Sequence, residues 1–491
     1  MPLAASLDDL LLSNSFAALP PDFYTRLKPQ GLTAPRLLHA NEDAAALLGL
    51  DPGVLGSEAF LRVFAGLDRL PGGDTLAAVY SGHQFGVWAG QLGDGRAHLL
   101  GEVRGPQGNW ELQLKGAGLT PYSRMGDGRA VLRSSVREYL ASEAMHGLGI
   151  PTTRALALVV SDDPVVRETV ETAAIVTRMA PSFVRFGSFE HWASQRQPEL
   201  LRQLADYVID QYYPACREAG EGGAPYLALL REVIGRTARL MAQWQLVGFC
   251  HGVMNTDNMS ILGLTLDYGP YGFMDAFRLD HVCNHSDTQG RYAWNRQPSV
   301  GLWNLYRLGG ALNVLIDDVE AVKAELGAYE AQFTTAFHDG MAAKLGIGPW
   351  RPDDEALLDG LLKLMHDQRA DFTLTFRRLS EALQGQTQPF LDLYMDREAA
   401  AAWLQKWSAR QESMGGDRDA RAKAMNRINP LYVLRNHLAE NAIRAAREGD
   451  TSVIVELLRI LKDPFDVHAG AEIYASLPPD WASDLEVSCS S

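Results

Sequence analysis

The sequence predicts an α+β protein with a two-lobed core, preceded by a helical lead-in and followed by a helical C-terminal extension. Residues 75–120 alternate short apolar runs with glycine turns, which indicates strands. Residues 190–250 and most of 306–475 carry apolar side chains at helical spacing. Between these helical parts, residues 251–267 place polar side chains at the spacing of the catalytic segment in kinase-like folds. These three observations together predict a protein-kinase-like two-lobed fold.

The bulk composition excludes several classes of protein. A length of 491 residues allows about three domains. The chain has 60 acidic and 45 basic residues and a net charge of −15, which argues against a nucleic-acid partner, because such partners usually need a basic face. No apolar run approaches the roughly 20 residues of a membrane span. The first 16 residues lack a basic region and contain Asp8-Asp9, so they make a poor secretory signal.

The four cysteines lie far apart, without a Cys-x-x-Cys pair: Cys216, Cys250, Cys283 and Cys489. This spacing does not support a structural zinc site. We therefore expect free thiols in a reducing compartment and a cytoplasmic protein. Cys489 is third from the end of the sequence and should lie on an exposed tail.

The chain is expected to divide into five consecutive parts. These are a lead-in (1–74), a lobe with the glycine hairpin, lysine strand and glutamate helix (75–186), a lobe with the catalytic and metal segment (187–345), a helical extension (346–480) and a cysteine-containing tail (481–491). Within the second lobe, a polar irregular stretch at 275–305 is interpreted as the loop where an activation segment would lie.

A glycine-rich stretch separates two short apolar runs at 87–89 and 97–100, and we expect these runs to pair as a β-hairpin. Glycine lets backbone N–H groups approach phosphates closely. The spacing Gly90-x-x-Gly93-x-Gly95 is the reverse of the usual kinase pattern Gly-x-Gly-x-x-Gly, so a plain tight hairpin remains an alternative. Arg96 favours the phosphate interpretation, because a cation beside a glycine turn suits a phosphate.

A lysine ends the next expected strand. Residues 110–115 alternate strictly between apolar and polar side chains and finish at Lys115, where kinase-like folds place their phosphate-pairing lysine. A solvated lysine at a sheet edge is the alternative. The following helix, expected over 131–146, carries Glu138 beside its apolar stripe. A strand lysine and a mid-helix glutamate can form the ion pair that positions a nucleotide phosphate.

Four further residues near this helix have two interpretations each. Asp127 and Gly128 precede the helix and are typical of a cap and turn. A strand over 173–178 ends in Arg178, and Arg185 follows it. Two arginines near a nucleotide cleft could neutralise terminal phosphates. Ordinary surface arginines remain the alternative.

The catalytic segment contains the metal-type residues of a kinase but lacks its base. Asn258 follows His251 by seven residues, and Asp267 opens an Asp-Tyr-Gly turn. In kinase-like folds these two residue types hold the magnesium of a nucleotide triphosphate. Two residues after the histidine, where those enzymes carry their catalytic Asp, this chain has Val253, and an acidic group reappears only at Asp257. We interpret this as a nucleotide–magnesium site with a displaced base, which indicates related chemistry at a different phosphorus atom.

With these residues, the chain resembles the selenoprotein O family, a group of kinase-like proteins long regarded as pseudokinases. The resemblance runs nearly end to end and includes many long motifs in order, which makes it highly specific. The matching stretches are 81–86, 91–96, 114–116, 120–124, 251–269, 283–287, 429–430 and 488–491.

The resemblance implies protein adenylylation (AMPylation), in which AMP passes from ATP to Ser, Thr or Tyr hydroxyls of other proteins. It also implies that ATP is flipped relative to ordinary kinases, so that the α-phosphate meets the acceptor, and that Mg²⁺ is the cofactor, with Mn²⁺ as an alternative. Asp257 would be the catalytic base, and Asn258 with Asp267 would hold the metal. The remaining nucleotide-binding residues carried over from the family are Gly93, Gly95, Arg96, Lys115, Glu138, Asp127, Gly128, Arg178 and Arg185.

The resemblance also suggests a redox pair. Selenocysteine-containing members of the family carry that residue near the C-terminus, and Cys489 occupies the matching place. We hypothesise a reversible disulfide between Cys283 and Cys489 that fixes the tail across the active-site loop. Two unpaired thiols are the alternative.

Two other functions remain open from the sequence. A conventional kinase transferring the γ-phosphate shares every metal and lysine feature but would have to use Asp257 as its base. A catalytically dead nucleotide-binding scaffold is disfavoured, because Lys115, Glu138, Asn258 and Asp267 are all present. The expected partners are ATP and hydroxyl-bearing proteins. The protein targets, the choice between Mg²⁺ and Mn²⁺ or between ATP and UTP, and the oligomeric state are not encoded in any motif.

Overall fold

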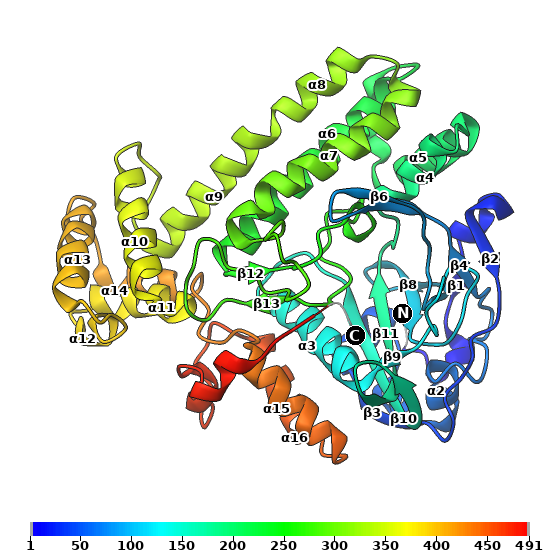
Figure 1. The fold of residues 1–491 in the computed structure, drawn as a ribbon, viewed down its shortest axis with the longest axis horizontal. Coiled ribbons are helices and arrows are strands. Elements are labelled where there is room, and N and C mark those ends of the chain that lie inside the picture. The colour runs from blue at the N-terminus through cyan, green and yellow to red at the C-terminus, as the bar shows by residue number, and fades with distance from the viewer. Residues whose placement is uncertain (1–2, 489–491) are drawn as a thin grey trace.

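The computed structural model describes residues 3–488 and shows a mixed helix-and-sheet architecture, which confirms the α+β prediction (Figure 1). Its largest sheet has 9 strands, and every pairing in it is antiparallel. The central order is β2-β4-β7-β8-β11-β10-β3, with β1 beside β7 and β9 beside β11. The strands are β1 (Leu12–Ser13), β2 (Tyr24–Arg26), β3 (Arg36–Ala40), β4 (Leu76–Ala78), β7 (Ala97–Gly105), β8 (Gly108–Lys115), β9 (Ala130–Val131), β10 (Arg154–Val166) and β11 (Val170–Ala180).

The two faces of this sheet have different partners. Leu112 and Leu114 of β8 point to one face, where they join a core with helices α1 (Glu42–Leu48) and α2 (Glu58–Phe64). Alternation along the strand sends Gln113 and Lys115 to the other face. Helix α3 (Leu132–Gly147) covers that face, so the two polar side chains are buried between sheet and helix.

The expected helical lead-in over 1–74 is wrong in part. Besides α1 and α2, this stretch supplies β1, β2 and β3, which are ladder partners of β7, β4 and β10. A boundary at residue 74 would therefore cut through one sheet. These strands have only two to five residues and no clear alternation, so they are defined by the sheet edges they cover rather than by their own pattern.

The expected hairpin between 87–89 and 97–100 is also wrong. Strand β5 (Ser81–Gln84) pairs with β6 (Val87–Gln91) in a separate two-stranded sheet, while β7 pairs with β8. Phe85 and Gly86 join β5 to β6 with φ of 50° and 81°. Two consecutive left-handed residues make the tight turn whose twist suits a hairpin. The glycine stretch after β6 is instead the connection into the large sheet.

The rest of the chain is mostly helical, as the periodicity predicts. Helices α15 and α16 pack against α3, whereas a separate apolar core joins α10, α11, α13 and α14 (Figure 1). Among residues 3–488 no helix has the length and apolar character needed to cross a membrane. The helices are α4 (Phe186–Ser194), α5 (Pro198–Tyr212), α6 (Ala224–Leu246), α7 (Gln297–Ile316), α8 (Val319–Gly327), α9 (Tyr329–Leu345), α10 (Asp354–Gln368), α11 (Phe372–Leu383), α12 (Gln388–Leu391), α13 (Arg397–Glu412), α14 (Arg418–Asn426), α15 (Asn436–Arg447) and α16 (Ser452–Lys462).

The catalytic segment is a long closed loop. Strands β12 (Phe249–Cys250) and β13 (Gly272–Phe273) pair antiparallel and bring its two ends together. Inside the loop, His251 Nε2 lies 2.9 Å from the backbone oxygen of Leu266, and its ring stacks on Trp244 of α6. The histidine thus fixes the residue next to Asp267, which is a structural role.

Candidate active site

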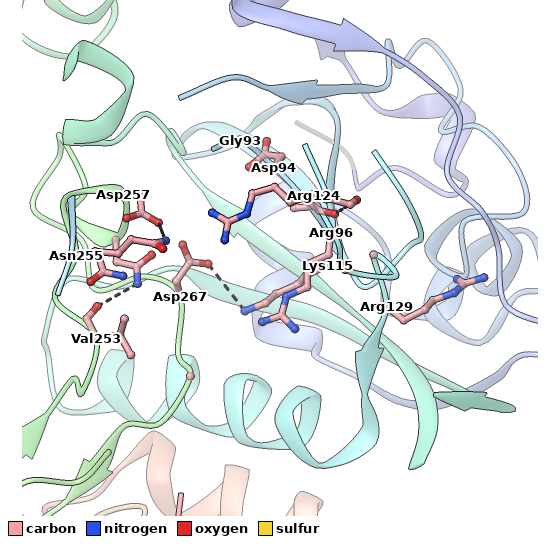
Figure 2. A pocket seen from close by; sticks show the side chains of 18 of the residues that line it. Gly93, Asp94, Arg96, Lys115, Arg124, Arg129, Val253, Asn255, Asp257 and Asp267 are labelled. Atoms are coloured by element: carbon pink, nitrogen blue, oxygen red, sulfur yellow. Dashed lines mark hydrogen bonds and ion pairs between the residues drawn. The ribbon is translucent and has the colours of Figure 1, made fainter. Parts of the chain in front are cut away.

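A cleft of about 770 Å³ lies between the large sheet and the catalytic segment. Asp267 stands between Lys115 on one wall and the segment with Asn255 and Asp257 on the other (Figure 2). Ten of the residues expected from the sequence line this cleft: Gly93, Gly95, Arg96, Lys115, Asp127, Gly128, Arg178, Asp257, Asn258 and Asp267. Glu138 and Arg185 lie behind the wall and bond to residues that line it.

Lys115 and Glu138 form the ion pair that the strand and helix patterns suggested, with 2.6 Å between Nζ and Oε2. Arg178 approaches the other oxygen of Glu138 at 3.2 Å. The register explains this, since Gln113 of β8 lies directly opposite Arg178 of β11 and both face α3. Each of the three charged side chains is at most 10% exposed. Because these charges are buried, removing any one of them would leave its partners without a counter-charge, at a high cost in stability.

Asp267 is held by three cations. Its Oδ2 lies 2.6 Å from Arg185 Nη1, its Oδ1 is paired with Arg178, and Lys115 Nζ is 3.9 Å away. Burial alone would raise the pKa of Asp267, but the charges of these cations outweigh it and keep that pKa well below its usual range. The backbone of Asp267 is left-handed, with φ of 57°. Such strain in a non-glycine residue is typical of functional sites.

Asp257 has a different environment. Burial raises its pKa to about 6, and Arg185 opposes that shift only in part. Gln84 Nε2 donates to Asp257 Oδ2 at 3.2 Å. The other oxygen, Oδ1, is buried and accepts no hydrogen bond from residues 3–488. The two cleft carboxylates therefore have pKa values displaced in opposite directions, which is a common feature of acid–base sites.

The residues expected to hold a metal present suitable atoms. Asn258 Nδ2 donates to the backbone oxygen of Val253 at 3.0 Å, which leaves its Oδ1 as the available ligand atom. Asp267 lines the same cleft with its carboxylate. Among residues 3–488 no group of three or more His, Cys, Asp or Glu side chains forms a metal site. Two oxygen donors fit Mg²⁺, because this ion is commonly held by one or two protein ligands together with substrate phosphates.

The glycines of the cleft are required by close packing. A Cβ on Gly93, whose φ is 142°, would lie 2.5 Å from Cγ of Tyr122. A Cβ on Gly128 would lie 2.2 Å from the backbone of Gly118. Asp127 accepts from the backbone N–H of Arg129 at 2.9 Å and pairs with Arg167 at 2.7 Å. Asp127 and Gly128 therefore line the cleft and also form the turn before α3, which was the alternative interpretation from the sequence.

Sequence reasoning missed four side chains of this site. Gln84 and Asp94 lie within stretches that the motifs included, but nothing marked them individually. Asp94 is 4% exposed and accepts from the backbone N–H of Ala78 at 3.0 Å. Gln113 bonds to Arg178 and is recognisable only from the register of the sheet. Arg167 lies at the end of a hairpin, where an arginine carries no local signal.

The suggested redox pair lies partly outside the described residues, since Cys489 falls beyond residue 488. Cys283 Sγ lies 3.0 Å from the backbone oxygen of Pro270. The backbone N–H of His285 donates to the oxygen of Val487 at 2.8 Å, so the described end of the tail meets the loop that holds Cys283. A disulfide between Cys283 and Cys489 stays a prediction.

Comparison with known proteins gives a concordant result. The family model described as Protein adenylyltransferase SelO matches residues 7–462. A Bordetella avium protein named Protein nucleotidyltransferase YdiU is 73% identical over 489 residues, covering 100% of each chain. Proteins of the same name from Bordetella petrii and Herminiimonas arsenicoxydans are 72% and 56% identical over 495 and 493 residues. The alignments cover 99% of this chain in both cases, with 100% and 98% of the relative.

The cleft is lined by cations and contains two carboxylates whose pKa values are displaced in opposite directions. The relatives are named as nucleotidyltransferases, and the matching family model is that of a protein adenylyltransferase. The protein is therefore an enzyme that transfers part of a nucleotide to a protein. More particularly, the chain belongs to the SelO family of protein adenylyltransferases. The family resemblance read from the motifs is thereby confirmed.

Proposed function

We propose that the protein transfers AMP from ATP to Ser, Thr or Tyr hydroxyls of protein substrates, and that Asp257 is the catalytic base. The observation that carries the proposal is the placement of this carboxylate beside Asn258 in the cleft, while Val253 occupies the kinase base position. We further infer that the large sheet with α3 and the helical body are the two lobes of a kinase-like fold. The strand lysine, helix glutamate and closed catalytic loop support this inference.

In this proposal the cations of the cleft bind the phosphates of ATP. Lys115, Arg96 and Arg178 line one wall, and Arg185 lies behind Asp267. Fixed cations in a partly buried cleft stabilise the charge that develops on a phosphate more strongly than water does, because they need no reorganisation. Glu138 would hold Lys115 in place, since it is a partner at 2.6 Å.

The metal of the proposed reaction is Mg²⁺, which Asn258 Oδ1 and the carboxylate of Asp267 would hold. When bound, it would neutralise phosphate charge. Mn²⁺ has similar ligand preferences and is an alternative.

Asp257 would act on the acceptor. Its carboxylate takes the proton of the substrate hydroxyl while the hydroxyl oxygen forms a bond to the α-phosphorus, and the bond from that phosphorus to pyrophosphate breaks. A base must be deprotonated to work and lies within about 2.6–3.2 Å of the proton's oxygen, or one water away. A pKa of about 6 suits this role near neutral pH, because the group is mostly ionised yet more basic than an exposed aspartate.

A labelling experiment tests the proposed function. The protein is incubated with a protein acceptor, Mg²⁺ and ATP labelled at either the α- or the γ-phosphate. We expect covalent label from the α-position only, because the acceptor retains AMP. Label from the γ-position would identify a kinase instead, and label from neither would identify a scaffold that only binds the nucleotide.

Replacing Asp257 by asparagine should lower kcat by roughly 10²–10⁴-fold, because the amide keeps the shape but cannot accept the proton. In the unsubstituted protein, kcat/KM should fall as the pH drops through about 6, where the carboxylate becomes protonated. The residual activity of the variant should lose this acidic limb. Nucleotide affinity, measured by calorimetry, is the control and should change little. If the variant keeps the same acidic limb, the pH dependence arises from a group other than Asp257.

A further inference from the structure

The end of β5 and the turn that leads into β6 are bonded to the catalytic segment. The backbone N–H of His83 donates to Thr256 Oγ1 at 2.7 Å, and that of Phe85 to Asn255 Oδ1 at 3.0 Å. Gln84 holds Asp257. Whatever contacts the outer side of this hairpin therefore lies next to the proposed base.

This outer side carries exposed aromatic residues around two hollows. Trp88, which is 41% exposed, lines a hollow of about 420 Å³ with Tyr306 of α7, which is 44% exposed, and β6 lies beside α4 and α7 (Figure 1). Phe85, 38% exposed, lines both the nucleotide cleft and a second hollow of about 340 Å³. The aromatic surface is thus continuous with the cleft. Exposed apolar groups gathered in this way are typical of binding surfaces.

Arginines flank the same hollows. Arg291 and Arg296 line the second hollow, and Arg307 lines the first. Arg291 and Arg307 lie 4.7 Å and 5.0 Å from the ring of Trp303, between the hollows. Within residues 3–488, none of the three guanidinium groups forms an ion pair with a carboxylate, although the chain has a net charge of −15. Glu190, at the floor of the first hollow, is buried and paired with His83 at 2.6 Å.

We propose that this acceptor surface, formed by Phe85, Trp88, Arg291, Arg296, Tyr306 and Arg307, binds an acidic segment of the protein substrate beside its acceptor hydroxyl. Carboxylates of that segment would contact the arginines, because guanidinium groups bind carboxylates through paired hydrogen bonds. An apolar side chain of the segment would enter the first hollow, between the rings of Trp88 and Tyr306. Trp, Tyr and Arg are the residues that contribute most to protein interfaces. The inference rests on the proposed function and names the substrate class of the same site.

The test uses two peptides that share one acceptor serine and one apolar residue. Asp and Glu flank the serine in the first peptide, and Asn and Gln replace them in the second. Binding to the full-length protein is measured by fluorescence anisotropy without nucleotide, and AMP transfer is measured with α-labelled ATP. The protein variants are Arg296→Gln with Arg307→Gln, both exposed. Arg296 Nη1 also donates to the backbone oxygens of Gln289 and Gly290, so thermal unfolding of the double variant is compared with that of the unsubstituted protein. Arg231→Gln, an exposed arginine on α6 paired with Glu325, is the matched control.

We expect the acidic peptide to bind more tightly and to have the lower KM. The double variant should raise its Kd and KM by roughly tenfold, equivalent to about 1.4 kcal/mol, and should leave the KM for ATP and the neutral peptide unchanged. Equal binding of the two peptides, or an unchanged preference in the double variant, would overturn the proposed acceptor surface. If charge-dependent binding occurs but no peptide or protein acquires label, the surface is retained and the proposed function fails.

Discussion

Replacing Asp267 by asparagine should reduce AMP transfer by roughly 10³-fold or more, because the substitution removes the only charged ligand proposed for the metal. The amide keeps the size of the carboxylate but has one acceptor oxygen instead of two, and Arg178 and Arg185 each donate to one oxygen of Asp267. The amide cannot neutralise Arg178 and Arg185, which are almost fully buried. The effect on activity should therefore be among the largest of any single substitution in the cleft. Transfer of α-label to a protein acceptor is the measurement.

The same substitution should destabilise the protein, and this effect must be separated from catalysis. Removing one partner of a buried ion pair typically costs about 3–5 kcal/mol. Thermal unfolding of the variant shows whether it is folded at the assay temperature. Asp280→Asn is the matched control, because Asp280 pairs with Arg278 on the surface and does not line the cleft. It should keep full activity. A folded Asp267→Asn protein with full activity would contradict the assigned role.

The parts of the site that could be predicted from the sequence are those with a strong local period. Alternation along 110–115 places Lys115 at the end of a strand, and helical spacing puts Glu138 beside an apolar stripe. The contact between them then needs only that the helix cover that face of the sheet. Asn258 and Asp267 are recognisable because their spacing is fixed by one closed loop.

Features set by pairing between distant strands could not be predicted in this way. The glycine stretch looked like a hairpin turn, but the two left-handed residues Phe85 and Gly86 make the turn earlier. Gln113 meets Arg178 through the register of β8 and β11, which no local pattern determines. The lead-in strands likewise depend on the edges they cover. Local periodicity therefore identified single elements better than their partners.

Replacing Arg435 by methionine should have the largest effect on stability outside the cleft. Its side chain is 1% exposed, lies 2.7 Å from Asp371 Oδ2 and also pairs with Asp275. The three residues join the start of α15 to α11 and to the chain after β13. Methionine fills similar space but leaves the buried Asp371 and the partly buried Asp275 without a counter-charge, which should lower the free energy of unfolding by about 3–5 kcal/mol. Urea unfolding at neutral pH measures the loss.

The pH dependence of this loss separates the missing charge from altered packing. Burial already raises the pKa of Asp275, and loss of the arginine should raise it further. A carboxylate whose pKa is raised in the folded protein destabilises it above that pKa, and protonation removes the penalty as the pH falls. The deficit of Arg435→Met should therefore shrink at mildly acidic pH, whereas a packing defect would persist. Arg459→Met, which removes an exposed arginine from its pair with Glu456, is the control and should leave stability almost unchanged at either pH.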